Sequence, residues 1–149
     1  MIDYSLDEYI PLIREVIESD GEFRLYPHGT SMLPLLRQGK DSVALVRPET
    51  IKRGDILLYQ RANGQYVLHR VVRVCRDGTL WFSGDNHMML EKGIEREQII
   101  ASSAAVFRGE KRKDSAAFGM RFYSKMMTFA LCKGIIIFAR RFGRIVKKR

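Results

Sequence analysis

Apolar residues near the N-terminus follow a helical period. Isoleucine recurs at positions 10, 13 and 17, behind Ser5 and Glu8, which have the S-x-x-E spacing of a helix cap. Pro11 weakens the first turn of this pattern. We predict one helix here, ending near residues 19–21, which read SDG.

Short apolar runs replace the helical period in the middle of the chain. Asn63-Gly64 and Asp77-Gly78 are typical of type I′ hairpin turns, in which both central residues need positive φ, so residues 55–84 are expected to form a three-stranded antiparallel meander. We predict a mainly β fold, a barrel or a sandwich, because many short strands follow one another without alternating helices. The expected strands are EFRLYP, SVALVRP, DILLYQR, QYVLHRVVRV, TLWFSG and IIASSAAVF.

The C-terminal segment returns to a helical period and has two distinct faces. At about 100° per residue its basic and apolar side chains fall on opposite sides. We therefore predict a basic amphipathic helix. Its basic face comprises Arg140, Arg141, Arg144, Lys147 and Lys148, and its apolar face comprises Ile135, Phe138, Phe142, Ile145 and Val146.

The charge distribution divides the chain in two. Residues 1–114 contain 17 Lys/Arg and 17 Asp/Glu, whereas residues 115–149 contain nine basic residues and no acidic one. The whole net charge of +9 therefore lies in the second segment. We predict a β domain over residues 1–114 and a basic helical tail over residues 115–149.

The composition of the tail is compatible with two arrangements. The tail either binds an anionic membrane surface or packs on the barrel as a helix with its basic face in solvent. Its longest nearly apolar stretch, residues 126–139, has 14 residues and contains Lys133, which is short of the ~20 that span a bilayer. Binding in the interface, with Phe and Ile at the acyl boundary and basic groups at the headgroups, is the better physical solution. No nucleic-acid partner is expected, because the tail has no recognisable binding fold for one.

The N-terminus and the cysteines indicate a cytoplasmic location. The sequence MIDYSLDEYI has no basic start followed by an apolar run, so it is not a secretory signal. Cys75 and Cys132 are too few for a disulfide framework. We expect a peripheral protein on the cytoplasmic side of the membrane, with insertion of the C-terminal segment as the alternative.

Three polar residues are candidates for chemistry. Ser31, in HGTSMLPLL, sits between a glycine turn and a proline, and a serine there is a nucleophile if a base reaches it, or simply a turn cap. His69, in VLHRVV, shares a strand face with Val67 and Val71, and Asp85 follows a strand in SGDN. Each of the two has a structural explanation when taken alone.

Taken together, the segments GTSMLPLL, RGDILLYQ, YVLHRVV and FSGDN resemble, in order and spacing, the conserved boxes of the S24/S26 serine peptidases. That superfamily includes type I signal peptidases and self-cleaving repressors, and the resemblance covers about residues 22–107. Bacterial members use a lysine where this chain has His69, and no lysine occurs between Arg53 and Glu91. The chain therefore looks like the endoplasmic-reticulum and archaeal type, which pairs serine with histidine.

The resemblance implies a role for each site residue. Ser31 is the nucleophile, His69 is the general base, and either Asp85 or Glu91 is the third member, with Asp85 slightly favoured. Bacterial members often have a hydroxyl residue at the position of Gly29, so the oxyanion site rests on the Ser31 N–H, with Thr30 as a possible second donor.

The expected function is a serine endopeptidase that cleaves a leader or precursor peptide through an acyl-enzyme, without a metal or cofactor. The alternative is a catalytically inactive S24/S26-like domain that acts as a membrane-associated binding or regulatory module. A metal hydrolase using His28, His69 and His87 is a third hypothesis, although their spacing fits no common zinc signature.

Overall fold

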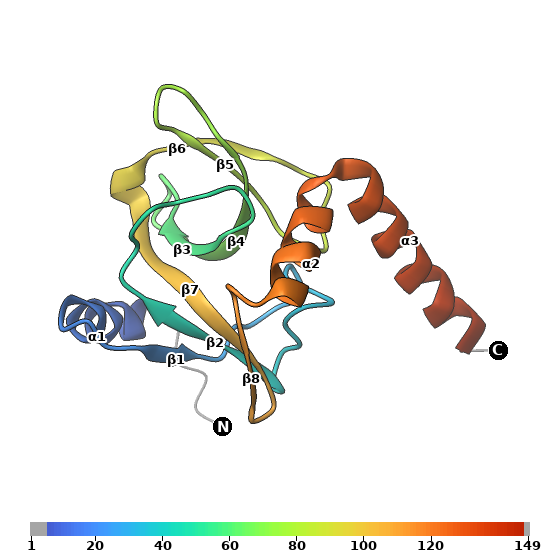
Figure 1. Cartoon of the computed structure of the whole chain (residues 1–149), viewed down its shortest axis with the longest axis horizontal. Coiled ribbons are helices and arrows are strands. Elements are labelled where there is room, and N and C mark those ends of the chain that lie inside the picture. The colour runs from blue at the N-terminus through green and yellow to red at the C-terminus, as the bar shows by residue number, and fades with distance from the viewer. Residues whose placement is uncertain (1–5, 148–149) are drawn as a thin grey trace.

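The computed structural model describes residues 6–147, in which a curled β-sheet is preceded along the chain by one helix and followed by two (Figure 1). Helix α1 spans Leu6–Glu18, and the C-terminal segment forms α2 (Phe118–Thr128) and α3 (Ala130–Lys147). The strands are β1 (Phe23–Leu25), β2 (Asp41–Val46), β3 (Ile56–Gln60), β4 (Tyr66–Val74), β5 (Leu80–Ser83), β6 (Glu91–Ile94), β7 (Ile99–Arg108) and β8 (Lys111–Asp114), with a short 3₁₀ turn at Arg96–Gln98.

The eight strands belong to a single antiparallel sheet. Their order is β1-β2-β7-β3-β4-β5-β6, and β8 pairs with β7 outside this path. The long strand β7 joins the N-terminal strands to the rest of the sheet, because it pairs with both β2 and β3. The prediction of a mainly β fold is confirmed, and α1 packs against β1, β2 and β7.

Burial on both faces of β3 divides the interior into two clusters. Ile56 and Leu58 point into the larger cluster, which α1 covers, whereas Leu57 and Tyr59 point into a second cluster on the opposite face. This alternation is the period of two that a strand imposes on its side chains. Strand β4 continues the second cluster with residues 67 and 71, so His69 lies on the face of the sheet that holds Tyr59.

Both predicted hairpins are present, but their turn type differs from the prediction. Gly64 and Gly78 have φ of 89° and 90°, whereas Asp20 is the one non-glycine residue with positive φ in the described range 6–147. The N–H of Gly64 bonds the carbonyl of Arg61, and the N–H of Arg61 bonds the carbonyl of Gln65. This pattern is a three-residue loop closed by a glycine bulge, so a type I′ turn is wrong here.

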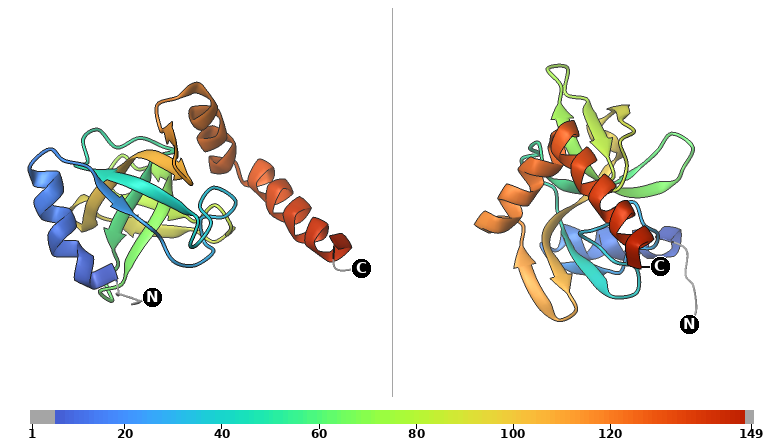
Figure 2. Two further views of the ribbon diagram at one scale, coloured as in Figure 1. Left: turned by 90° about the horizontal axis from the view of Figure 1, so that it is seen from below. Right: turned by 90° about the vertical axis from the view of Figure 1, so that its right-hand side faces the viewer.

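The C-terminal segment forms two helices where one was predicted. Phe129 between them is extended, with φ −93° and ψ 120°, and residues 118–128 and 132–145 meet at a bend of 94°. Helix α2 joins the larger core cluster through Met120, while α3 runs outward from the sheet (Figure 2). Ser5 and Lys148 of the predicted elements lie outside the described residues, as do the side chains of Val146 and Lys147.

Within residues 6–147, no single helix has the length and apolar composition needed to cross a bilayer. The bent pair of α2 and α3 meets those two criteria jointly.

Candidate active site

Ser31 lies in a tight turn, and buried residues that follow it in the chain fix the turn to the core. Gly29 has φ +85°, a conformation that glycine adopts without strain, and its N–H bonds the side chain of Gln38. Met32 and Leu36 are buried in the larger cluster and fix the turn to the sheet. Within residues 6–147 neither the hydroxyl nor the N–H of Ser31 has a hydrogen-bond partner, so both stay available to a ligand.

Gly84 is the point where the serine turn and the histidine strand meet. A Cβ built on Gly84 would lie 2.7 Å from the Ser31 carbonyl oxygen and 3.2 Å from His69 Nε2. The N–H of Asn86 donates to that same Ser31 carbonyl at 2.8 Å. The segment after β5 therefore holds the backbone of Ser31 beside the Nε2 edge of the imidazole, and no side chain fits between them.

The other ring nitrogen of His69 faces a tyrosine and a carboxylate. Nδ1 lies 3.4 Å from the Tyr59 hydroxyl, and the negative charge of Glu91 acts on both groups by raising their pKa values. Arg61 donates to both Glu91 oxygens, at 2.7 and 2.6 Å. These bonds hold the pKa of Glu91 below its usual value, so Glu91 is ionised. In the tautomer whose Nδ1–H donates to the Tyr59 oxygen, the Nε2 lone pair faces Gly84 and Ser31.

Burial sets the protonation state of His69. The side chain is inside the protein, and this desolvation lowers its pKa to about 4. The cations of Arg61 and Lys133 also lower the pKa, whereas the charge of Glu91 raises it. The imidazole is therefore neutral at pH 7, which is the form a general base needs.

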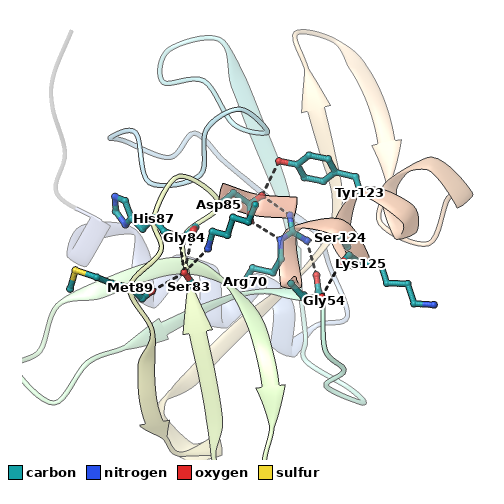
Figure 3. Close-up of polar contacts among 12 residues, drawn as sticks. Gly54, Arg70, Ser83, Gly84, Asp85, His87, Met89, Tyr123, Ser124 and Lys125 are labelled. Carbon is teal, nitrogen blue, oxygen red and sulfur yellow. Dashed lines mark hydrogen bonds and ion pairs between the residues drawn. The ribbon is translucent and has the colours of Figure 1, made fainter. Parts of the chain in front are cut away.

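Asp85 is engaged elsewhere, in a buried ion pair (Figure 3). Its two carboxylate oxygens each accept from Arg70 at 2.7 Å, and Tyr123 of α2 donates to one of them at 3.2 Å. Arg70 also donates to the Gly54 carbonyl and to the Ser124 hydroxyl. Of the two candidate acids, Asp85 joins the sheet to α2, and Glu91 is the one whose charge acts on His69.

Helix α3 brings a lysine into the same region. Lys133 is buried, and its Nζ donates to Ser83 Oγ at 2.6 Å, directly before Gly84 in the chain. Burial lowers the pKa of Lys133 to about 8. The Ser83 hydroxyl lies 2.8 Å from the Met89 carbonyl and 3.1 Å from that of His87, and its single proton serves these acceptors (Figure 3). Through Ser83, Lys133 therefore supports the loop that follows β5.

The site opens into a cavity of about 1280 Å³. Ser31, His69 and Glu91 line it together with Ile137 and Arg141 of α3. Thr30 is exposed beside it, and its carbonyl accepts the Leu33 N–H of the turn. A cavity of this size accommodates several residues of an extended peptide.

The three histidines do not converge as metal ligands do. The rings of His69 and His87 are 6.2 Å apart edge to face, and His28 contacts Gln38. Across the described residues 6–147, no group of three or more His, Cys, Asp or Glu side chains is placed to hold a metal ion.

Comparisons with protein-family models, with curated proteins and with solved structures give no match for this chain. The function proposed below therefore rests on the geometry of the site and on the sequence segments that form it. Sequence reasoning missed Tyr59, Arg61, Arg70 and Lys133. For Tyr59 a signal existed, since the strand period places it on the face of β3 that turns toward His69.

Proposed function

We propose that this protein is a serine endopeptidase that hydrolyses a leader or precursor peptide through an acyl-enzyme. The observation that carries the proposal is the convergence at Gly84, where the Ser31 backbone and the lone-pair edge of a neutral His69 meet in a cavity wide enough for a peptide. The order and spacing of the four sequence segments support the same conclusion, because they resemble those of the S24/S26 peptidases.

The proposed reaction gives each group of the site a defined role. His69 Nε2 takes the proton of the Ser31 hydroxyl as the oxygen attacks the scissile carbonyl, and the Ser31 N–H donates to the oxyanion. Tyr59 and ionised Glu91 stabilise the imidazolium that forms. His69 then gives the proton to the leaving amine. A water molecule, deprotonated by the same nitrogen, attacks the acyl carbonyl, and His69 returns that proton to the Ser31 oxygen as the bond from Ser31 to the acyl group breaks.

The test is cleavage of a peptide with small residues flanking the bond, with wild type and variants assayed in parallel. Ser31→Ala and His69→Ala are each expected to remove nearly all cleavage, and the double variant is expected to be scarcely worse, because the two groups act as one unit. Ser19→Ala is a matched control, since Ser19 directly follows α1 and its exposed hydroxyl donates to the Glu15 carbonyl. Full activity in Ser31→Ala would refute the nucleophile, and loss of activity with EDTA would favour the metal hypothesis.

A binding module remains the second candidate, because Ser31 and His69 share no hydrogen bond within the described residues. Catalytic hydrogen bonds often form when substrate binds, so this geometry suits both candidates. A serine-directed acylating probe separates them. Labelling that Ser31→Ala abolishes supports the peptidase, whereas peptide binding without labelling supports the module.

A further inference from the structure

One side of helix α3 packs against the rest of the protein, and this side carries the buried residue Lys133. Lys133 and Ile137 are buried, and Arg140 donates to Asn86 at 2.5 Å. At about 100° per residue these three residues lie on one side of the helix. That side rests on the loop after β5 and on the wall of the cavity, which Ile137 lines.

The opposite side of α3 is apolar and faces solvent. We define this outer face by four side chains with 56–69% of their surface exposed, namely Ile135, Phe138, Phe142 and Ile145. A helix that packs on its own protein normally buries such a stripe and exposes its charges. Here the apolar stripe is exposed although Lys133 is buried, so nothing within the described residues 6–147 covers the outer face.

Exposed apolar side chains extend from α3 to the rim of the cavity. Met88 lies beside Gly134 of α3 and is about half exposed, and Met89 next to it is 83% exposed. Both methionines line the cavity. The outer face and the cavity rim are therefore neighbouring parts of one end of the molecule.

The charge around the outer face decides what can cover it. Arg141 borders the outer face, Arg144 lies farther round the helix toward its packed side, and both are exposed, while residues 115–149 contain no acidic residue. A second copy of this chain would bring two basic helices together, which costs electrostatic energy. An anionic lipid surface accepts the Phe and Ile side chains at its acyl boundary and the arginines at its headgroups.

We propose that the outer face of α3 docks on an anionic lipid surface, with the helix lying in the interface. This inference does not depend on the peptidase activity, because it rests on the exposure and charge of α3 alone. Docking in this way holds the cavity rim beside the lipid, since Ile137 and Arg141 of the same helix line the cavity.

The experiment is cosedimentation of the full chain with vesicles of phosphatidylglycerol and phosphatidylcholine, and with vesicles of phosphatidylcholine alone. Wild type is expected to bind the anionic vesicles, and the binding is expected to weaken steeply with added salt. Phe138→Ser/Phe142→Ser is expected to lower the bound-to-free ratio by about tenfold or more, because two large apolar side chains no longer enter the lipid. Leu12→Ser, which alters an exposed apolar residue of α1, is the control and is expected to bind like wild type.

A second pair of variants tests the charge. Arg141→Gln/Arg144→Gln is expected to lose most anionic-vesicle binding, whereas Arg14→Gln/Arg76→Gln removes the same charge from exposed sites elsewhere and is expected to keep it. Circular dichroism verifies that all variants are folded. Equal binding by Phe138→Ser/Phe142→Ser and wild type would overturn the proposal, as would a dimer that this variant converts to a monomer while wild type ignores the vesicles.

Discussion

Gly84 leaves no room for a side chain in the candidate site. The Ser31 carbonyl and the His69 imidazole both lie close to the position that a Cβ at residue 84 would take. In Gly84→Ala the new Cβ meets the Ser31 carbonyl at 2.7 Å, a distance that forces the backbone to move. A displacement near 1 Å of a catalytic group typically costs on the order of 10²-fold in rate, so we expect a loss of that size in kcat/KM. Gly119→Ala, with open space around the new methyl group, is the control and should cleave normally. Unchanged cleavage by Gly84→Ala would show that Ser31 and His69 do not act together.

The buried imidazole of His69 predicts activity at unusually low pH. The pKa of an exposed histidine is about 6.5, whereas burial lowers that of His69 to about 4. The neutral base is therefore present down to about pH 4, and we expect the acid limb of the kcat/KM profile near that value. An acid limb near 6.5 would contradict the burial of the base.

The same lowered pKa of His69 makes folding pH-dependent. Between pH 6.5 and pH 4 the unfolded chain binds a proton at this histidine and the folded chain does not. The free energy of unfolding therefore falls as the pH is lowered, by at most about 1.4 kcal/mol per pH unit from this group. Urea titrations across this range measure the slope, and His69→Asn should reduce it. An equal slope in that variant would assign the effect to other groups.

The two acids have different tasks, and two variants separate them. Asp85→Asn leaves the guanidinium of Arg70 buried without its counter-charge, which is expected to lower the free energy of unfolding by about 3–5 kcal/mol. Glu91→Gln removes the charge that stabilises the imidazolium, so kcat/KM should fall on the order of tenfold with little loss of stability. Thermal melts and cleavage assays measure both effects, and Glu110→Gln, in an exposed pair, is the control. The reverse pattern would make Asp85 the third catalytic residue.

Among the elements, α3 contributes a residue to the site, Lys133, that the sequence pattern did not predict. Lys133→Met keeps the length of the side chain and removes the cation that lowers the pKa of His69. The acid limb of the cleavage profile should therefore move toward higher pH while cleavage at pH 7 persists. Loss of cleavage at pH 7 in a folded Lys133→Met protein would instead indicate that Lys133 is the general base.

The strands that sequence reasoning identified are those with a buried face. All six expected strands are present, whereas β6 and β8 were missed because their sequences EKGI and KRKD are largely polar, and every residue of β8 is exposed. Such strands form because a neighbouring edge offers hydrogen bonds, which no local pattern reveals. The hairpin glycines were placed correctly, but the loop length that sets the turn type depends on how the flanking strands pair.

The site was predictable as far as it depends on chain order. Ser31, His69 and Glu91 line one cavity, as the order of the segments suggested. The contact between Tyr59 and His69 depends on which face of β3 turns inward, and the ion pair of Arg70 with Asp85 depends on how the loop after β5 folds back. Lys133 arrives from a helix 50 residues beyond Ser83, by a docking that the sequence pattern does not encode.

At the scale of the whole molecule, the outer face of α3 and the cavity lie on two sides of one helix. If the peptide substrate carries an apolar leader that partitions into the bilayer, enzyme and substrate share a surface and their effective concentration rises. We expect anionic vesicles to increase the apparent kcat/KM for such a peptide and to leave that for a soluble peptide with the same cleavage sequence unchanged. Phe138→Ser/Phe142→Ser should retain the basal rate, because these side chains point away from the cavity, and should lose the increase. An increase that persists in this variant would mean that the lipid acts through the peptide alone, and that docking of α3 does not contribute to cleavage.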